Sequence, residues 1–574
     1  MDRRTALGMP AGHGGQEQEM AGESVIPDAA NKSLPSVLRT TAGVEPYAGP
    51  WGPAQVAHLL RRSTFGASRA DRAALAALSI DQAIDRILDD SMPDTSAPLN
   101  TNAQDLVPVG QTWVNAIYRD TASTFSPTGA RMNSLRSWWI QRMVLQEASI
   151  REKMVLFWHN HFVTEVPDVN DPRISYRYVD LLRRNALGNF RALARDMTLE
   201  ASMLIYLNGN TNTRTNPNEN YARELQELFT IGKGPEVAPG DYTNYTEVDV
   251  RAAARVLTGW RTLTNADGTV GPVTWRFDST RHDPSDKQFS HRYQDRVITG
   301  RAGDAGVEEL DDLITMIFEQ PETARYLCRK LYRWFVYYVV DDQVERTVIA
   351  PMADLLRASD YDVKPALRLL LRSAHFFDPV NMGCVIKSPL DLIVGMAREC
   401  EMQIPAADIA QEYTFLLYLV TQGSAMQQYL GQPPDVAGWS AYYQSPQYYE
   451  LWINSDTLPR RTRLSTTFAR SGYTTGGATL VIDSLAFASR LNRPDEPDLL
   501  IDELCDCLYP IPLTSAQKAF LKNTLLPGLP DYEWTVEWMD YVNDPTNPLK
   551  STPVKSKLQT LLSTMMQMPE FQLQ

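Results

Sequence analysis

Apolar side chains that recur every three or four residues are the feature that most restricts how this chain can fold. Ile80, Ile84 and Ile87, for example, fall on one stripe of a helix. Ser79 precedes them and is a residue type that caps helix N-termini. The same spacing returns from Trp51 almost to the end of the chain, and residues 132–162 predict two helices with a break near Ser149. The pattern therefore predicts a mainly α fold.

Composition and patterning divide the chain into three expected parts. Residues 1–48 are rich in Gly, Pro, Ser and Ala without periodicity, which is typical of a flexible leader. Residues 49–465 are expected to form a large, multi-helix, bundle-like core domain. A small β-containing loop insertion is expected within it at about residues 261–300, where 273–277 favours strand. Residues 466–574 are expected to form a helical C-terminal region that packs on the core.

The charge balance and the motif inventory exclude several classes of function. The chain has 55 Lys+Arg against 69 Asp+Glu, a net charge of −14, so a nucleic-acid partner is not expected. No apolar run reaches the ~18 residues of a membrane-spanning helix. The five cysteines do not form a disulfide framework, and the single Cys505-x-Cys507 pair lacks the second pair of a zinc site. Dinucleotide, P-loop, G-x-S-x-G and H-E-x-x-H motifs are absent.

The first candidate site is His159-Asn160-His161, at the end of an apolar helical segment. Imidazole is a common ligand of transition metals, so His159 and His161 are candidate ligands of a divalent metal ion. They could also act as a base and its orienting group. In the alternative interpretation, one histidine caps the helix end and the other is buried against aromatic rings.

The second candidate is a polar stripe that follows Pro217, with Asn216 as the expected helix cap. Asn220, Arg223, Glu224 and Glu227 are spaced i, i+3, i+4 and i+7, which places them on one helix face. We expect Glu224 and Glu227 to supply charge for a cation or for proton transfer. Asn220 and Arg223 are expected to bind substrate, with Arg223 on an anionic group. The alternative is a solvated face with ion pairs between residues four apart.

The third candidate is His282-Asp283, in the polar loop that follows the strand-like stretch. A histidine held on a loop over a rigid scaffold can serve as acid, base or ligand, so both residues are candidate catalytic groups. The alternative is a turn in which the aspartate bonds the backbone.

The fourth candidate is Trp439, which opens an aromatic stretch that ends at Trp452. Its rings could line a groove for sugars or flat apolar ligands, which makes Trp439 a candidate substrate-binding residue. The same rings could instead fasten a loop onto the core.

Seven ordered motifs support a family resemblance. They are AHLLRRSTFG (57–66), KMVLFWHNHF (153–162), NENYAREL (218–225), YTEVDV (245–250) with ARVLTGW (254–260), HD (282–283) with KQF (287–289), KSP (387–389) and PPDVAGW (433–439). Over roughly residues 50–465 the chain resembles the bacterial family catalogued as domain of unknown function 1800. The resemblance implies a large helical protein, often exported to the periplasm or beyond. It also implies a sulfatase-like partner protein encoded nearby, but no catalytic assignment.

Taken together, these patterns predict a hydrolase-type enzyme with one polar site. The residues expected to converge there are His159, His161, Glu224, Glu227, His282 and Asp283. An envelope or extracellular substrate such as a polysaccharide is expected. The alternative is a non-catalytic scaffold or partner-binding protein whose polar motif residues form buried ion pairs. Arg3-Arg4-x-x-Leu7 resembles a twin-arginine export signal, but the apolar stretch of about 7–15 residues does not follow it, so a cytoplasmic location is also open.

Overall fold

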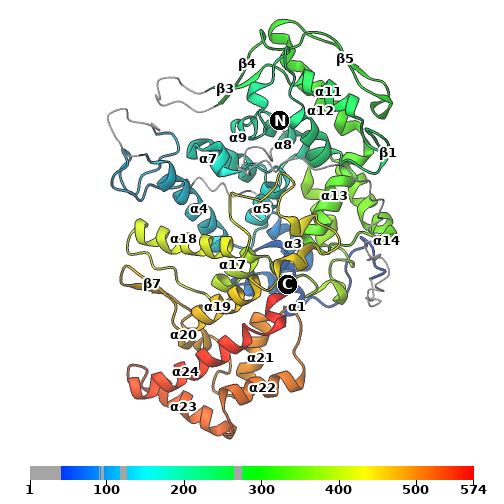
Figure 1. Ribbon diagram of the computed structural model, residues 1–574. Helices are drawn as coiled ribbons and strands as arrows, with labels where there is room; N and C mark the ends of the chain where they lie inside the picture. The colour runs from blue at the N-terminus through cyan, green and yellow to red at the C-terminus, as the bar shows by residue number, and fades with distance from the viewer. Residues whose placement is uncertain (1–39, 90, 92–95, 117–125, 264–273) are drawn as a thin grey trace, which may run out of the picture. The chain divides into compact units, whose positions relative to one another are not determined.

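Helices dominate the structure, which is a computed structural model that describes residues 40–89, 91, 96–116, 126–263 and 274–574 (Figure 1). The predicted leader lies mostly outside the described residues. The α-helices of the first half are α1 (Pro53–Ser63), α2 (Arg69–Ala76), α3 (Ile80–Ile87), α4 (Thr128–Leu145), α5 (Arg151–His161), α6 (Val166–Val169), α7 (Pro172–Arg184), α8 (Phe190–Leu199), α9 (Ala201–Tyr206), α10 (Glu219–Glu224) and α11 (Glu247–Val256).

The second half of the chain continues the helical pattern. Its α-helices are α12 (Glu308–Glu319), α13 (Pro321–Phe335), α14 (Asp342–Val344), α15 (Ala350–Ala358), α16 (Val363–Leu371), α17 (Pro389–Glu399), α18 (Ile409–Ala425), α19 (Thr457–Ala469), α20 (Ser484–Ser489), α21 (Pro497–Leu508), α22 (Ser515–Leu525), α23 (Asp531–Asn543) and α24 (Pro548–Met565). Within the described ranges, no helix is both long and apolar enough to cross a membrane.

The described strands form only short antiparallel hairpins. They pair as β1 (Glu236–Ala238) with β2 (Asp241–Tyr242), β3 (Trp260–Leu263) with β4 (Thr274–Phe277), β5 (Lys287–Gln288) with β6 (Val297–Ile298), and β7 (Tyr473–Thr475) with β8 (Ala478–Leu480). The β3–β4 pair confirms the predicted β-containing insertion, and the fold is mainly α as predicted.

Local sequence signals explain where several helices begin. The Ser79 side chain accepts a hydrogen bond from the backbone N–H of Gln82, and the Gln82 side chain accepts one from the backbone N–H of Ser79. Helix α3 therefore begins with a capping box. α4 ends at Leu145 and α5 begins at Arg151, which confirms the predicted break. The predicted cap of α10 is wrong. Asn218, not Asn216, caps the helix, since its side chain accepts from the backbone at residue 220.

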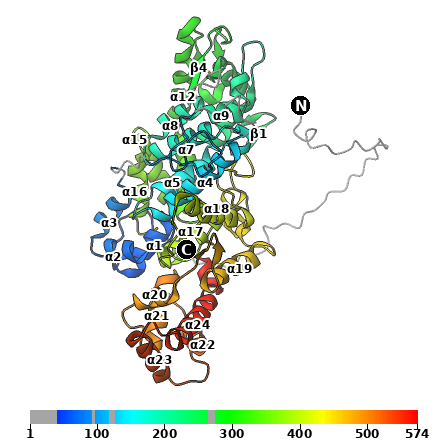
Figure 2. The ribbon, with the colours of Figure 1, turned by 90° about the vertical axis from the view of Figure 1, so that its left-hand side faces the viewer.

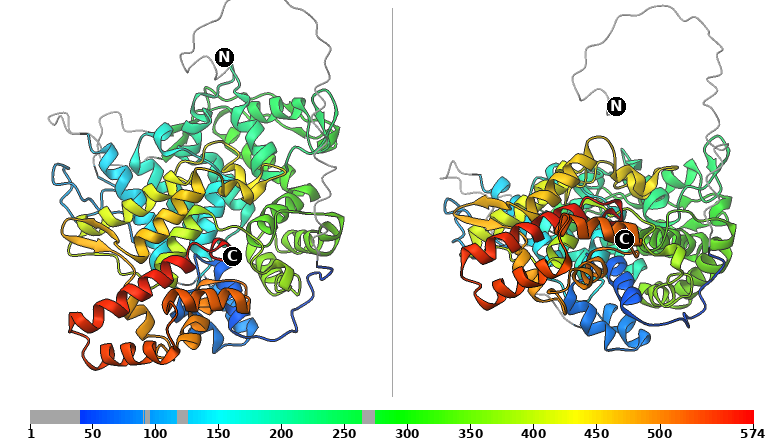
Figure 3. Two further views of the ribbon diagram at one scale, coloured as in Figure 1. Left: turned by 60° about the horizontal axis from the view of Figure 1, so that its bottom comes forward. Right: turned by 90° about the horizontal axis from the view of Figure 1, so that it is seen from below.

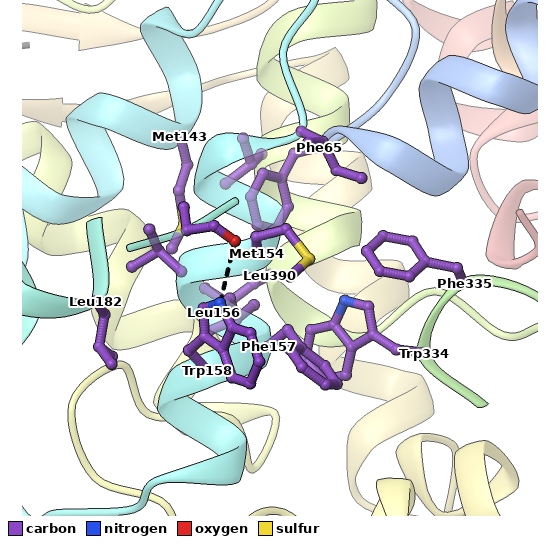
Figure 4. Close-up of a cluster of buried hydrophobic side chains, with 14 of the residues drawn as sticks. Phe65, Met143, Met154, Leu156, Phe157, Trp158, Leu182, Trp334, Phe335 and Leu390 are labelled. Carbon is purple, nitrogen blue, oxygen red and sulfur yellow. Dashed lines mark hydrogen bonds between the residues drawn. The ribbon is translucent and has the colours of Figure 1, made fainter. Parts of the chain in front are cut away.

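Helix α5 runs through the hydrophobic core and is buried on nearly all sides. Only its middle, residues 154–158, is apolar all round, as expected for a buried helix segment. Figure 4 shows Phe157 and Trp158 of α5 packed among side chains of other elements, including Phe335 of α13 and Leu390 of α17. The two histidines of the motif therefore lie at the end of a core helix. Their surroundings are set by packing.

The C-terminal helices α20–α24 pack against one another and against α19 (Figures 2 and 3). The last described residues return to the segment before α17, where Leu573 pairs with Ile386. Arg461 of α19 donates to the carbonyl of Lys387 at 2.8 Å and to the side chain of Gln572 at 3.2 Å. Backbone pairing and buried hydrogen bonds thus tie the C-terminal residues to the helices before them.

Candidate active site

The polar stripe on α10 continues into a single π-helical turn, Leu225–Thr230. Such turns are rare in proteins. Those that occur are often found at functional sites, because the extra residue in the turn redirects side chains. Glu224 ends α10 and Glu227 lies within the π-helical turn. Both carboxylates are partly exposed, so this stripe is neither a fully solvated face nor a closed core network.

Glu224 is in an environment that favours its protonated form. Burial raises the pKa of Glu224 to about 7, and the negative charges of Glu227 and Asp435 contribute further. The cations Arg223 and Lys233 oppose the shift but do not cancel it. A carboxyl group with this pKa can both give and take a proton near neutral pH.

Glu227 has partners that stabilise a negative charge. Its Oε2 accepts a hydrogen bond from the Tyr245 hydroxyl at 2.7 Å, and its Oε1 lies 3.6 Å from Lys233 Nζ. Burial, together with the hydrogen bond to Glu227, raises the pKa of Tyr245, so the phenol keeps its proton and remains the donor. The two neighbouring carboxylates therefore have different surroundings.

Arg223 is held by a third carboxylate at the start of α11. Its Nη1 and Nη2 donate to the two oxygens of Glu247 at 2.6 and 2.8 Å, which is a two-pronged guanidinium–carboxylate pair. Nη2 also lies 3.3 Å from Glu219, four residues earlier. Asn220 is exposed on the first turn of α10. Substrate binding by Arg223 and Asn220 stays a prediction.

His161 and Lys330 donate hydrogen bonds to backbone carbonyl groups of the π-helical turn. His161 Nε2 is 2.9 Å from the carbonyl of Phe229 and must carry the proton, because a carbonyl only accepts. Its Nδ1 therefore accepts from Lys330 Nζ at 3.2 Å, and Lys330 also donates to the carbonyl of Leu228 at 3.0 Å. The hydroxyl of Tyr326 donates to the same carbonyl at 3.1 Å. Burial lowers the pKa of Lys330 to about 7 and keeps His161 neutral by lowering its pKa.

His159 is also buried in the core. Its Nδ1 is 2.8 Å from the Tyr178 hydroxyl, which itself donates to the carbonyl of Phe162, so Nδ1 carries the proton. Nε2 is left without a hydrogen-bond partner among the described residues, beside the rings of Trp139 and Trp439. Burial lowers the pKa of His159 to about 3.

The metal hypothesis gains no support from this donor set. Both ring nitrogens of His161 are engaged, one of them with a lysine. Across the described ranges, no group of three or more His, Cys, Asp or Glu side chains is arranged to hold a metal ion. Ligation by His159 and His161 remains a prediction.

The loop 431–439 is fastened to the end of α5. The backbone N–H of Trp439 donates to Asn160 Oδ1 at 2.9 Å. Gly438 has φ +98°, and a Cβ there would lie 2.4 Å from the same oxygen, so only glycine fits this approach. The Trp439 ring is buried against His159, as in the alternative in which the aromatic residues fasten the loop. This anchoring leaves Asp435 close enough to influence Glu224.

His282 does not join the carboxylate cluster. Its Nε2 is 3.0 Å from Glu309, its Nδ1 is 3.0 Å from the carbonyl of Thr258, and it is fully enclosed. Lys287 makes a buried ion pair with the same Glu309. The arrangement is a closed polar network that ties this loop to α12.

Asp283 pairs with Arg255 at 2.7 Å, near the end of α11, while Glu247 at the beginning of α11 pairs with Arg223. Glu247 and Arg255 are eight residues apart on this helix, a distance of about 12 Å at 1.5 Å per residue. The structure thus brings together the histidine motif, the polar stripe and the loop 431–439, and keeps His282-Asp283 apart from them.

Sequence reasoning missed several members of the cluster. Tyr245 lies within a quoted motif, but nothing in the pattern assigned it to Glu227. Lys233, Tyr326 and Lys330 lie outside the motifs, and the lysine of α13 occupies an ordinary position of an amphipathic helix. No signal short of the tertiary contacts would have found them.

The family assignment agrees with these motifs. The family model described as "Protein of unknown function (DUF1800)" matches residues 58–573. The chain belongs to the DUF1800 family. The match continues through the C-terminal helices, beyond residue 465, where the motif-based resemblance ended. No curated protein and no solved structure matches this DUF1800 protein.

Proposed function

We propose that this DUF1800 protein is an acid–base enzyme of the hydrolase type, with Glu224 as the general acid and Glu227 as its partner carboxylate. The observation that carries the proposal is the contrast between the two groups. Glu224 has a pKa of about 7, and Glu227 accepts a hydrogen bond from Tyr245 with Lys233 nearby. A carboxyl group that holds a proton near neutral pH beside a second carboxylate is an arrangement used for acid–base catalysis.

In the proposed reaction, protonated Glu224 gives its proton to the leaving oxygen as the bond to that oxygen breaks. The Glu227 carboxylate takes a proton from the attacking water, whose oxygen forms the new bond. Transfer of that proton back to Glu224 through solvent restores the starting state. A pair of carboxyl groups in these roles is typical of glycoside hydrolysis, which supports a polysaccharide as the substrate class.

Another glutamate has a similarly raised pKa but lacks this arrangement. Burial raises the pKa of Glu200 to about 7. Its side chain, however, accepts from the backbone of Ser202 at the start of α9, and its charged neighbours are arginines. Glu200 is therefore a helix cap without a paired carboxylate.

The second candidate, a non-catalytic scaffold, is favoured by the ion pairs of the other motifs. Arg61 of the first motif donates to Glu399 at 2.9 Å, with both side chains almost fully enclosed. The network of His282 and Glu309 is equally closed. Under this alternative the polar stripe of α10 would also serve only to join helices.

The deciding experiment is hydrolysis of a panel of acidic and neutral polysaccharides by the full chain, followed through new reducing ends. Glu224→Gln and Glu227→Gln should each reduce the rate by about 10²–10⁴-fold, the range of one acid or base. Glu219→Gln is the matched control, because it alters the same helix and should change the rate by less than about twofold. Full activity in Glu224→Gln would refute the proposal.

A further inference from the structure

Helix α23 has two apolar faces, and only one of them is buried. Trp534 and Trp538, four residues apart, are buried on the side where α23 packs on α24 and α21, and their ring centroids are 5.8 Å apart. The Trp534 indole N–H donates to the carbonyl of Pro494 at 2.7 Å. These contacts fully account for a surface helix, which needs only one apolar face.

The second apolar face of α23 is open to solvent, at the outer edge of the C-terminal helices (Figures 1 and 2). Tyr532, Val536 and Met539 form an outer stripe, because their spacing of i, i+4 and i+7 places them on one side of the helix. They are 63%, 54% and 44% exposed. Leu529, before the helix, and Val542, near its end, are exposed as well. Single exposed apolar residues are ordinary, but a continuous row of them is typical of a protein-binding surface.

One edge of the outer stripe is negatively charged. Glu533 follows Tyr532 by one position, and Asp540 follows Met539 by one position. The two carboxylates are seven residues apart, which places them on the same edge of the helix at a separation of about 10 Å. The apolar row and the acidic edge therefore run side by side for two helical turns.

The neighbouring helices leave these two edge carboxylates without a cation. Helix α23 has four acidic residues and no basic one. Lys522 of α22 pairs with Asp531 at 2.8 Å, and Lys557 of α24 pairs with Glu537 at 2.5 Å. Among the residues that the structure describes, no ion pair reaches the carboxylates at positions 533 and 540. A partner that covers the outer stripe would meet this charge and would need cations of its own to match it.

The same charge argues against a second copy of this chain as the partner. A two-fold contact brings the same patch of both molecules together, so the acidic edge would meet carboxylates and no cation of α23. The net charge of −14 adds to the repulsion between copies. The surface therefore favours a partner of opposite charge.

We propose that the outer stripe is the docking site for a basic amphipathic helix of another protein. Apolar side chains of that helix, at i, i+4 and i+7, would pack on Tyr532, Val536 and Met539. Lys or Arg residues seven positions apart would pair with Glu533 and Asp540, because two turns of either helix span the same length. This surface does not include the carboxylates of the proposed function, so its test is independent of catalysis.

The test is the binding of labelled, designed helical peptides to the full chain, followed by fluorescence anisotropy. The probe is a peptide of about 20 residues with Leu along one face and Lys along both edges, and the comparison peptide has Glu in place of each Lys. The Lys peptide should bind at least about tenfold more tightly than the Glu peptide at low salt. The difference should shrink as salt screens the charges.

Two sets of variants separate the apolar contribution from the charge. Val536→Ser with Met539→Ser should weaken binding of the Lys peptide by about tenfold. The matched control is Val248→Ser with Val297→Ser, since these valines are 45% and 44% exposed and lie outside the surface. Replacing both edge carboxylates by lysine should reverse the preference, so that the Glu peptide binds more tightly. Thermal melts establish that the variants are folded.

Absence of binding by the Lys peptide, equal binding of both peptides, or unchanged binding after the serine substitutions in α23 would each overturn the proposal. Two further results would assign the surface to another partner and overturn it as well. One is self-association of the full chain in sedimentation that these substitutions abolish. The other is binding to neutral phosphatidylcholine vesicles that they abolish.

Discussion

Removing the charge of Glu227 should lower the pKa of Glu224. Burial is the larger cause of the rise from 4.5 to about 7, and Glu227 is the next. Carboxylates on neighbouring helical turns, about 6 Å apart and half-exposed, repel by about 1.4 kcal/mol at an effective dielectric constant of about 40. That energy is about one pKa unit. In Glu227→Gln, the protonated share of Glu224 at pH 7 should therefore fall from about one half to about one tenth.

The assay is an NMR titration of the ¹³C-labelled glutamate side chains between pH 4 and pH 9. Glu224 is assigned by the signal that disappears in Glu224→Gln. The control is Glu219→Gln, which removes a charge from the exposed first turn of α10 and should move the titration by less than about 0.3 unit.

Two results would refute the reasoning. If Glu224 titrates near its ordinary value in the unaltered chain, burial does not hold the proton. If Glu224 titrates near neutral pH but does not shift in Glu227→Gln, the two carboxylates are not coupled, and the acid–base pair is lost as an explanation.

Three further predictions concern stability. Glu309→Gln leaves Lys287 as an uncompensated buried cation and should cost about 3–5 kcal/mol in urea unfolding, whereas the exposed Asp311→Asn on the same helix should cost less than about 0.5 kcal/mol. Gly438→Ala should cost about 1–3 kcal/mol and lower the melting temperature, because φ is +98° and the added carbon meets α5; an unchanged melt would contradict this. Lys330 has a folded-state pKa of about 7, below its unfolded value of 10.5, so the unfolded chain binds more protons between these values and stability should rise with pH from 7 to 10. Lys330→Met should remove that part of the rise in a comparison of urea midpoints, and an identical slope would count against it.

Local signals predicted elements well where one segment decides the outcome. Ser79 and the isoleucine stripe gave α3, and the break near Ser149 lies between α4 and α5. The predicted cap of α10, Asn216, lies two residues before the actual cap. Asn212 accepts from the backbone N–H of Asn218 and fixes the chain there, and Asn216 is taken up in a bridge with residue 213. Proline position alone does not reveal such a contact.

The candidate site was only partly predictable for the same reason. Spacing placed Glu224 and Glu227 on one stripe. The loop position of His282 predicted that it joins the same site, but that residue lies in a closed network with Glu309. The histidine motif predicted His161 as a metal ligand, or as a base or its orienting group. Its actual role, holding a carbonyl of the π-helical turn, depends on Lys330 from a helix about 170 residues away in sequence.

The sequence by itself determined the helical character, the hairpin insertion, the family and the carboxylate stripe, because each depends on short-range periodicity or on the order of motifs. The tertiary structure decided which polar residues are enclosed and which stay open. Burial raises the pKa of Glu224, and Asp435 of the loop 431–439, from a distant part of the chain, adds the effect of its negative charge. Charge spacing along one helix does not contain that information.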